Sequence, residues 1–408
     1  MPLLNIDEAL NRLLSATQTL EIENASLSNI GLRQVLADDI TAKLTEPPFR
    51  SSAMDGYAIR VSDFAKSSSF KVIGESAAGK GFSGKIGNGE AVRIFTGAPV
   101  PDDADCVVIQ EKTEIKDDII VITDTPKLND NIRPLGGHFK KGDTVFSKGK
   151  VVSPAAIALC ASSGYATIPV IRRPKVAILA TGNELVAPGE IPGKDQIVCS
   201  NSFGLAQIAR SRDCQVIDLG IARDNEESIR SAIKKARQEG ADLLLTSGGV
   251  SVGKYDLVQT VLKDEGMELD FWKIAMRPGK PLMFGTLPGE HKMLVLGLPG
   301  NPVSSLVCAH LFLVPVLEKL SGRVYAPHIE NAVLNAPLPK NGPRKHFIRA
   351  NLTRGANGEA HVTPVSSPDS SMIRLMANAD CLIIQEENGT PLNVGDSCRI
   401  FIPDEIGL

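Results

Sequence analysis

Three loops rich in glycine and proline each follow an apolar run in this 408-residue chain. Leu243–Gly253 opens into Ser-Gly-Gly, Met276–Pro281 sets two cations in a stiff loop, and Leu294–Ser305 passes through Pro-Gly-Asn-Pro into a helix start. Parallel α/β sheets bind ligands where the carboxyl ends of their strands meet, and helix N-termini there offer unpaired N–H groups to anions. The pattern therefore predicts an anion-binding crevice, most simply for phosphates.

Carboxylates are expected on the rim of the same crevice. Glu184, Asp224 and Asp256 each follow a predicted strand or its loop, so they would face one edge of the sheet. Carboxylates that share a rim repel each other unless a cation such as Mg²⁺ joins them to a phosphate. The alternative is that Asp224 and Asp256 merely cap the helices that begin near Glu226 and at Leu257. All three on one rim favour metal and phosphate chemistry.

Three cations accompany the acidic rim. Lys273, Arg277 and Lys280 are four and three residues apart. Lys273 is equally consistent with an exposed strand residue, whereas Arg277 and Lys280 lie in a loop braced by Pro-Gly-Pro. Fixed cations beside carboxylates suit an oxyanion together with a metal-bound phosphate.

The glycine-rich segment Gly248–Lys254 fits the G-x-x-x-x-G-K pattern of a P-loop. The next residue is Tyr255, where that motif needs a Ser or Thr hydroxyl for Mg²⁺, so a true P-loop is disfavoured. No G-x-G-x-x-G follows a predicted strand, which leaves a dinucleotide-binding fold without its signature.

These residues need a multidomain α/β protein to position them. From residue 173 the pattern alternates strand and helix, which predicts a central doubly wound, mainly parallel sheet. The expected elements are strands Val176–Ala180, Gln215–Leu219, Leu243–Thr246, Phe271–Ile274, Leu282–Phe284 and Met293–Leu296, and helices Ser202–Ser211, Glu226–Gln238, Leu257–Lys263 and Val303–Leu320. The domains are 1–45 plus 138–172 (helical or mixed), 46–137 (an inserted β domain), 173–324 (α/β) and 325–408 (a small C-terminal β domain).

Composition narrows the class of protein. The net charge is −3 with both signs mixed, which argues against nucleic-acid binding. Seven scattered cysteines without a C-x-x-C pair predict free thiols in a reducing cytoplasm. The N-terminus predicts an amphipathic helix capped by Asn5 with Glu8, and the most apolar helix, Val303–Leu317, is too short for a bilayer. No membrane association is expected.

Seven motifs in order resemble one family. They are Ser-x-Met-Asp-Gly-Tyr-Ala at Ser52, Phe-Thr-Gly-Ala at Phe95, Asn-Ile-Arg at Asn131, Thr-Gly-Asn-Glu-Leu at Thr181, Ser-Gly-Gly-Val-Ser-x-Gly at Ser247, Arg-Pro-Gly-Lys-Pro at Arg277 and Gly-Leu-Pro-Gly-Asn-Pro-Val-Ser at Gly297. Together they look like the molybdenum-insertion enzymes of molybdenum cofactor synthesis, and they are similar also to the C-terminal region of gephyrin. The resemblance covers nearly the whole chain.

The resemblance implies a four-domain homodimer whose active site lies between subunits. The implied reaction takes molybdate and adenylylated molybdopterin as substrates and, with Mg²⁺, releases AMP and molybdenum cofactor. Enzymes that adenylylate molybdopterin and molybdoenzymes that accept the cofactor are implied partners. Residues carried over as catalytic are Asp55, Thr96, Glu184, Asp224 and Asp256, with Glu184, Asp224 and Asp256 as metal ligands. Residues carried over as substrate-binding are Lys273, Arg277, Lys280, Ser247, Gly248, Gly249, Ser251, Pro299, Gly300, Asn301 and Pro302.

Two positions depart from the family's pattern. Arg277 stands where the family commonly has Lys, which keeps the charge but turns a point ammonium into a planar fork. His138 stands where the family usually has an acidic residue. Asp143 lies five residues further on and either supplies the missing carboxylate or is a plain turn residue after Gly142.

Two other functions compete with molybdenum insertion. Enzymes that adenylylate molybdopterin share the expected fold of the α/β domain and its Ser-Gly-Gly and Pro-Gly-Asn-Pro loops, but the segments around Asp55 and Thr96 and the C-terminal domain argue against that step. A non-catalytic, gephyrin-like scaffold is the other alternative. The acidic and basic rim is retained except at His138, which argues against the scaffold.

Overall fold

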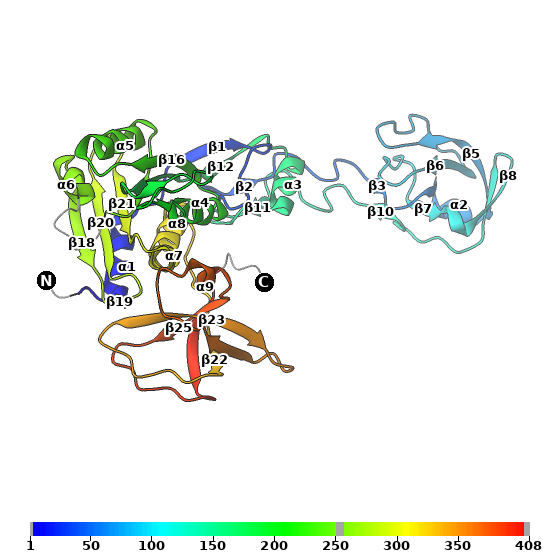
Figure 1. Ribbon diagram of the computed structural model, residues 1–408. Coiled ribbons are helices and arrows are strands. Elements are labelled where there is room, and N and C mark those ends of the chain that lie inside the picture. The colour runs from blue at the N-terminus through cyan, green and yellow to red at the C-terminus, as the bar shows by residue number, and fades with distance from the viewer. Residues whose placement is uncertain (1–2, 250–256, 404–408) are drawn as a thin grey trace. The chain divides into compact units, whose positions relative to one another are not determined.

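The computed structural model describes residues 3–249 and 257–403, which divide into two compact units (Figure 1). Unit 1 consists of residues 1–23, 31–35 and 170–408, and unit 2 of residues 24–30 and 36–169. All seven cysteines of the chain are buried and free, in agreement with the absence of a disulfide framework from the sequence pattern.

Unit 1 contains the α/β module that the strand and helix alternation predicts. Its six-stranded sheet has the order β16 (Gln215–Ala222), β13 (Lys175–Thr181), β17 (Leu243–Ser247), β21 (Met293–Leu298), β20 (Pro281–Leu287) and β18 (Glu268–Lys273). The first four strands run parallel, and β20 and β18 are antiparallel to their neighbours. The sheet is therefore mixed, with its parallel part on the side of the glycine-rich loops.

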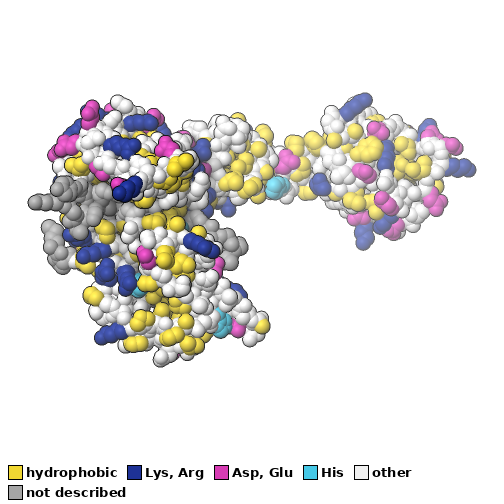
Figure 2. Space-filling model, in the orientation of Figure 1, with side chains coloured by type: hydrophobic (Ala, Val, Ile, Leu, Met, Phe, Trp, Pro, Cys, Tyr) yellow, Lys and Arg dark blue, Asp and Glu magenta, His cyan; other side chains and the backbone are white. Residues whose placement is uncertain are grey.

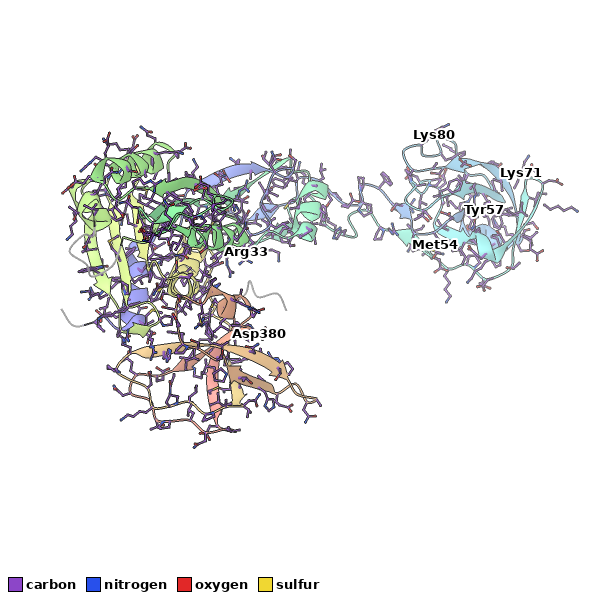
Figure 3. The ribbon with its side chains drawn as sticks, in the orientation of Figure 1. Arg33, Met54, Tyr57, Lys71, Lys80 and Asp380 are labelled. Atoms are coloured by element: carbon purple, nitrogen blue, oxygen red, sulfur yellow. The ribbon has the colours of Figure 1, made fainter. Side chains whose placement is uncertain are left out.

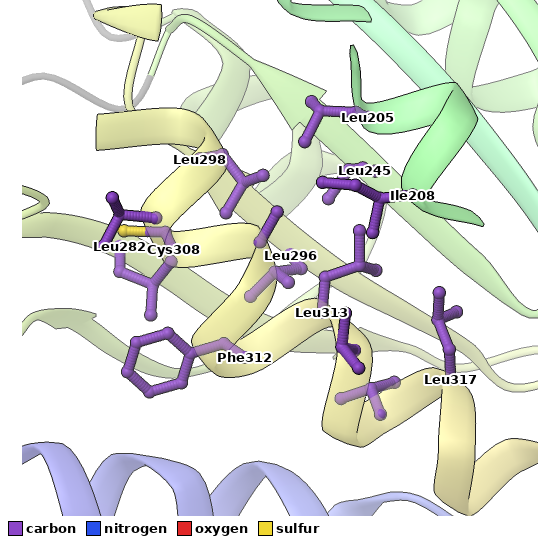
Figure 4. Close-up of a cluster of buried hydrophobic side chains, with 14 of the residues drawn as sticks. Leu205, Ile208, Leu245, Leu282, Leu296, Leu298, Cys308, Phe312, Leu313 and Leu317 are labelled. Atoms are coloured by element: carbon purple, nitrogen blue, oxygen red, sulfur yellow. The ribbon is translucent and has the colours of Figure 1, made fainter. Parts of the chain in front are cut away.

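Helices cover both faces of this sheet. One face packs on α1 (Ile6–Ala16), α4 (Asn201–Ser211) and a continuous helical run. This run consists of α7 (Pro302–Cys308), a π-helical turn (Ala309–Leu313) and α8 (Val314–Leu320). The other face packs on α5 (Glu226–Gln238) and α6 (Leu257–Asp264). Strand residues alternate between the two cores, as in β17, where Leu243 and Leu245 face the first and Leu244 the second. Figure 4 shows the first core, where Leu245 lies near Leu205 and Ile208 of α4.

The apolar run from Pro302 to Leu320 is a core helix. It spans 19 residues and is long and apolar enough to cross a membrane by length and composition, but 83% of its most apolar window is buried inside the protein. The helix expected over Val303–Leu320 is confirmed, and it continues through Pro315. The expectation that its apolar part, Val303–Leu317, is too short for a bilayer is wrong by length, because the apolar helix includes three further residues at its end. A π-helical turn directly before Pro315 loosens the hydrogen-bond ladder where the proline ring would otherwise meet the preceding turn.

A small β module follows the sheet domain within unit 1. Its strands are β22 (Ile329–Leu334), β23 (Lys345–Arg354), β24 (Ala360–Pro364), β25 (Cys381–Gln385) and β26 (Ser397–Phe401), with α9 (Ile373–Ala377) between β24 and β25. The pairing of β23 with both β24 and β25 closes these strands into a barrel. A two-residue strand from the sheet domain, β19 (Met276–Arg277), pairs in parallel with β23 and so joins the cation loop to the barrel.

Unit 2 holds a six-stranded β module and a smaller mixed part. The module has the order β7 (Cys106–Ile109), β4 (Gly56–Ile59), β6 (Glu90–Ile94), β5 (Ser69–Ser76), β9 (Ile119–Ile122) and β8 (Thr113–Lys116). Other elements of unit 2 include β2 (Ile40–Thr41), β3 (Ser51–Ser52), α2 (Val61–Phe64), β10 (Ile132–Arg133), β11 (Thr144–Phe146) and α3 (Pro154–Ser162). Helix α3 begins at the predicted Ser-Pro, where Ser153 Oγ accepts the Ala156 N–H.

The segment with His138 contains a local turn. Asp143 Oδ2 accepts the Lys140 N–H at 2.8 Å, and the Asp143 N–H returns to the Lys140 carbonyl at 3.0 Å. The turn interpretation of Asp143 therefore accounts for its carboxylate. The His138 ring lies against Phe139, with ring centroids 4.8 Å apart.

Candidate active site

The carboxyl ends of three parallel strands meet at one edge of the unit 1 sheet. The register pairs Ala180 of β13 with Ser247 of β17, and Ser247 with Leu298 of β21. The loops that begin at Thr181, Ser247 and Leu298 therefore start side by side. This is the edge at which the sequence predicts the anion-binding crevice.

Glycine is required at the start of the Ser-Gly-Gly loop. Gly248 and Gly249 have φ angles of +92° and +66°. A Cβ on Gly248 would lie 2.8 Å from the Thr181 carbonyl oxygen, and one on Gly249 would lie 2.3 Å from Cγ2 of Val258. Because Gly248 and Gly249 lack side chains, the backbone of this loop can approach its neighbours and a ligand more closely than any other residue would allow.

A hydrogen-bond bridge connects the loops that the sequence predicts to bind substrate. The Asn201 side-chain amide donates to Ser247 Oγ at 2.9 Å and to the Gly300 carbonyl at 2.7 Å. Asn301 donates to Ser370 Oγ at 2.9 Å, which joins the Pro-Gly-Asn-Pro loop to the segment before α9. Predicted substrate-binding residues brought to this edge are Ser247, Gly248, Gly249, Pro299, Gly300, Asn301 and Pro302; Ser251 lies outside the described residues.

Two of the predicted metal ligands lie at the same edge. Asp224 accepts the Asn183 N–H at 3.1 Å, and Asn183 Oδ1 accepts the Asp224 N–H at 3.1 Å. The alternative that Asp224 caps α5 is wrong, because Asn225 makes that cap by accepting the Ser228 N–H at 2.9 Å. Glu184 folds its carboxylate back over Gly182, where a Cβ would lie 2.4 Å from Oε2.

The metal site itself stays a prediction. Among residues 3–249 and 257–403, no group of three His, Cys, Asp or Glu side chains is placed to hold a metal ion. Asp256, the third predicted ligand, lies outside these ranges. Glu184 and Asp224 nevertheless offer carboxylate oxygens, the donors that Mg²⁺ prefers, and Mg²⁺ commonly takes only one or two carboxylates plus substrate phosphate.

A cationic cleft lies between the sheet domain and the barrel of unit 1. Its volume is about 440 Å³. The charged lining residues are Arg277, Lys280, Arg344 and Asp369, and the hydroxyl-bearing ones are Ser304, Ser367 and Ser370. Figure 2 shows Lys and Arg side chains gathered where the sheet domain meets the barrel. The residues from Arg277 to Pro281 form one wall of the cleft, as expected for the braced loop.

The cations of this cleft have no carboxylate partner among the described residues, although Arg344 donates to the Met276 carbonyl at 3.4 Å. Within the described part of the chain no carboxylate oxygen lies within 4.0 Å of the charged nitrogens of Arg277, Lys280 or Arg344. Asp369 is engaged elsewhere, since its Oδ1 accepts both the N–H and the hydroxyl of Ser371 at 2.9 Å, which lowers the pKa of Asp369. Positive charge that no carboxylate of the described residues neutralises suits a site for an oxyanion.

The third predicted cation, Lys273, does not line the cleft. Lys273 lies at the end of β18, and its Nζ is 4.2 Å from the centroid of the Trp272 ring, a cation–π contact. The structure thus brings Arg277 and Lys280 together and leaves Lys273 on the adjoining strand.

Arg344 and the serines of the cleft have no counterpart among the sequence predictions. Arg344 follows the turn Asn341-Gly342, and Ser367 and Ser370 lie in the loop before α9. Arg349 fixes that loop by donating to the Ser367, Asp369 and Met372 carbonyls at 2.7, 2.9 and 3.0 Å. No local sequence signal marks these residues, because only the docking of the barrel brings them to the cation loop.

Unit 2 presents a separate pair of predicted catalytic residues. Asp55 Oδ1 accepts the backbone N–H of Thr96 at 2.7 Å and its hydroxyl at 2.9 Å. These two bonds, with the charge of Arg93, lower the pKa of Asp55. Both bonds use one oxygen, which leaves Oδ2 for a ligand. Figure 3 labels Met54 and Tyr57, which bracket the Asp55 turn in the β module.

Arg93 holds this turn in place through hydrogen bonds and cation–π contacts. Its guanidinium carbon lies 5.0 Å from the centroids of both the Tyr57 and the Phe95 rings, and its nitrogens donate to the Gly56 carbonyl at 3.3 Å and to Gln110 Oε1 at 2.7 Å. The arginine therefore connects the strand that leads to Thr96 with the strand that follows Asp55. Asp55 is presented as a fixed, ionised carboxylate.

Comparison with known proteins gives a consistent result along the chain. Residues 4–164 match the MoeA N-terminal region (domain I and II), residues 177–319 a probable molybdopterin binding domain, and residues 331–401 the MoeA C-terminal region (domain IV). A Haemophilus influenzae protein named molybdopterin molybdenumtransferase is 36% identical over 408 residues, which is 98% of both chains. A Staphylococcus aureus protein of the same name is 33% identical over 98% of this chain and 95% of its own.

The fold comparison agrees. The crystal structure of the molybdopterin biosynthesis protein MoeA from Pyrococcus horikoshii superimposes with a TM-score of 0.80 at 30% identity, covering 98% of this chain and 99% of that one. Sequence and structure match over the sheet domain, the N-terminal region and the C-terminal barrel alike. The chain belongs to the MoeA family of molybdopterin molybdenumtransferases.

Proposed function

We propose that the chain inserts molybdenum from molybdate into adenylylated molybdopterin and releases AMP and molybdenum cofactor. The observation that carries this proposal is the cleft beside the glycine-rich loops, where Arg277, Lys280 and Arg344 have no carboxylate partner among the described residues. Molybdate is a tetrahedral dianion, and it suits a cleft that combines fixed cations with serine hydroxyls. The match to family regions on both sides of the molybdopterin-binding domain supports insertion over the adenylylation step.

Each part of the site has a role in this reaction. The Ser-Gly-Gly and Pro-Gly-Asn-Pro loops bind the phosphate end of the substrate through backbone N–H groups, since Gly248 and Gly249 admit close approach. Arg277, Lys280 and Arg344 hold molybdate and stabilise the negative charge that develops as the phosphoanhydride breaks. Asp55, ionised by its bonds to Thr96, is available for a proton or a metal.

Mg²⁺ would be held by Glu184 and Asp224, with Asp256 as the third predicted ligand. When bound, Mg²⁺ would supply charge neutralisation at the phosphates. The carboxylates of this chain then position the anhydride, and the reciprocal bonds between Asp224 and Asn183 keep that part of the rim in place.

We further propose a homodimer in which the Asp55 and Thr96 turn of one subunit completes the cleft of the other. Support comes from the division of the predicted catalytic residues between unit 2 and unit 1. The seven free cysteines support a cytoplasmic location. Enzymes that adenylylate molybdopterin and the apo-molybdoenzymes that need the cofactor are the expected partners.

The reaction is tested by incubating the purified protein with adenylylated molybdopterin, Mg²⁺ and molybdate, and following AMP release. We expect AMP to appear only when both Mg²⁺ and molybdate are present. A double variant, Arg277→Ala with Lys280→Ala, should require a higher molybdate concentration. AMP release that does not depend on molybdate would contradict the proposal and indicate a simple hydrolase.

A further inference from the structure

Asn201, the first residue of α4, connects the loops that follow the neighbouring strands β17 and β21. Its side-chain amide donates one hydrogen to Ser247 Oγ at 2.9 Å and the other to the Gly300 carbonyl at 2.7 Å, so both amide hydrogens are used. The two loops are also close to each other, since the Gly248 N–H donates to the Leu298 carbonyl at 3.3 Å. One side chain thus joins the Ser-Gly-Gly loop to the Pro-Gly-Asn-Pro loop.

Helix α4 holds Asn201 at a fixed position. Gly204 lies directly against α7, because a Cβ at Gly204 would be 3.0 Å from Cδ2 of Leu306. Leu205 and Ile208 are buried in the core that Figure 4 shows. A side chain carried by a packed helix is positioned more precisely than one carried by a loop. Asn201 can therefore set the geometry of both loops.

The bond from Asn201 also determines how Ser247 can interact with a ligand. Ser247 is buried at the end of β17. A serine hydroxyl has one hydrogen to donate and two lone pairs that accept, and Asn201 occupies a lone pair. Among residues 3–249 and 257–403, the Ser247 hydroxyl donates to no acceptor. Its hydrogen therefore remains for a ligand at the Ser-Gly-Gly loop, and a phosphate oxygen is a suitable acceptor.

We propose that Asn201 is a positioning residue for the adenylyl phosphate: it holds the two loops at a fixed separation and leaves Ser247 to donate its hydroxyl hydrogen to that phosphate. Aspartate in place of Asn201 would accept the Ser247 hydrogen and would repel the Gly300 carbonyl. Alanine would release both loops and leave the Ser247 hydroxyl without a fixed direction. The inference rests on the proposed function, because that function assigns the phosphate end of the substrate to these loops.

Equilibrium binding of AMP, the nucleotide product of the proposed reaction, tests this role in the full-length protein. Calorimetry compares wild type with Asn201→Ala and Asn201→Asp. Asn201→Ala should weaken AMP binding by about tenfold and Asn201→Asp by about a hundredfold, because aspartate also withdraws the Ser247 hydrogen and adds negative charge. Asn335→Asp is the matched control and should leave the affinity unchanged, since Asn335 donates to Thr363 Oγ1 at 3.3 Å on the exposed surface of the barrel.

The variant Ser247→Ala separates hydroxyl orientation from a general effect on the fold. In the Ser247→Ala background the hydroxyl that Asn201 orients is absent, so adding Asn201→Ala should cost clearly less AMP affinity than it does in wild type. Equal losses in both backgrounds, or wild-type AMP affinity in a folded Asn201→Ala protein, would overturn the role of Asn201. Absence of AMP binding in wild type would instead overturn the proposed function of these loops.

Steady-state turnover gives a readout that a disturbed fold would not reproduce. Neither Asn201 nor Ser247 lines the cationic cleft. In Asn201→Ala the KM for adenylylated molybdopterin should therefore rise by about tenfold, whereas the molybdate concentration at half-maximal turnover should stay within about twofold of wild type. A rise of both values by the same factor would indicate general disruption of the site and contradict the positioning role.

Discussion

A Cβ atom on Gly279 would lie 2.4 Å from Sγ of Cys308, and Gly279 has a φ of +104°. The thiol is completely buried under the cation loop, 3.9 Å from the Gly279 carbonyl oxygen and 4.0 Å from Sδ of Met276. The backbone that carries Arg277 and Lys280 is thus seated directly on the core of the sheet domain. In Figure 4, Cys308 lies next to Leu282, which belongs to the strand that follows this loop.

Gly279→Ala should displace this loop and weaken oxyanion binding. The substitution meets both a strained φ and a buried sulfur, so we expect a loss of roughly 1–3 kcal/mol in the free energy of unfolding together with lower molybdate affinity. Gly342→Ala is the matched control, because a Cβ there has no atom within 4 Å. Adding Cys308→Ala should recover part of the loss. A stable Gly279→Ala protein with wild-type molybdate affinity would show that the loop is free to move.

The pH dependence of Asp55 tests the role of Thr96. Hydrogen bonds from Thr96 lower the pKa of Asp55 in the folded protein. Whatever stability they contribute is therefore present above the unfolded pKa and is lost as the pH falls through the folded value. Thr96→Val removes the hydroxyl bond and keeps the N–H bond, so the acid limb of turnover should move to higher pH. Thr96→Ser should restore it. If the acid limb is unchanged in Thr96→Val, Asp55 is not the group whose protonation limits turnover at low pH.

The carboxylates on the rim should control the need for Mg²⁺. Asp224→Asn and Glu184→Gln are expected to raise the Mg²⁺ concentration at half-maximal turnover and to lower the rate by roughly 10²–10³, the scale for one preorganised electrostatic partner. Glu227→Gln, an exposed carboxylate in the first turn of α5, is the control. Asp256→Asn is predicted from the sequence to behave like Asp224→Asn. Variants that keep the wild-type Mg²⁺ dependence would place the metal elsewhere.

Mixed dimers test whether two subunits share one site. Asp55→Ala and Asp224→Ala should each be inactive alone. After subunit exchange, one cleft of a mixed dimer would pair an intact Asp55 turn with an intact rim, and activity should recover to about a quarter of wild type for random pairing. If activity does not recover once mass spectrometry has verified subunit exchange, both residues belong to a single subunit's cleft.

The sequence predicts the sheet domain well because its signals are local. Helix α5 runs from Glu226 to Gln238 as expected, since an apolar stripe at helical spacing follows the Asn225 cap. At the N-terminus only half of the expected cap pair forms: Asn5 accepts the Asp7 N–H, whereas the Glu8 carboxylate binds Arg12. The competing Glu8–Arg12 pair is an i,i+4 contact on the helix surface, and the local sequence offers both this pair and the cap without showing which one forms.

The cleft shows the same limit. Arg277 and Lys280 are found from their Pro-Gly-Pro loop, but Arg344 and Ser370 enter the site only because β19 pairs with β23 and Asn301 bonds to Ser370. These contacts join residues far apart in the chain, so neither spacing nor periodicity signals them. For Asp224 the local sequence offers two adjacent cap residues, and Asn225, not Asp224, caps the helix.

In the proposed reaction, the cleft of Arg277, Lys280 and Arg344 holds molybdate while the neighbouring loops release AMP. The most direct measurement follows AMP release and pterin-bound molybdenum together, over a range of molybdate concentrations, for wild type and for Arg344→Ala. We predict that both products form in equal amounts and that Arg344→Ala shifts both curves to at least about tenfold higher molybdate with little change in affinity for adenylylated molybdopterin. An Arg344→Ala protein that instead loses affinity for the adenylylated pterin and keeps the wild-type molybdate curve would contradict the assignment.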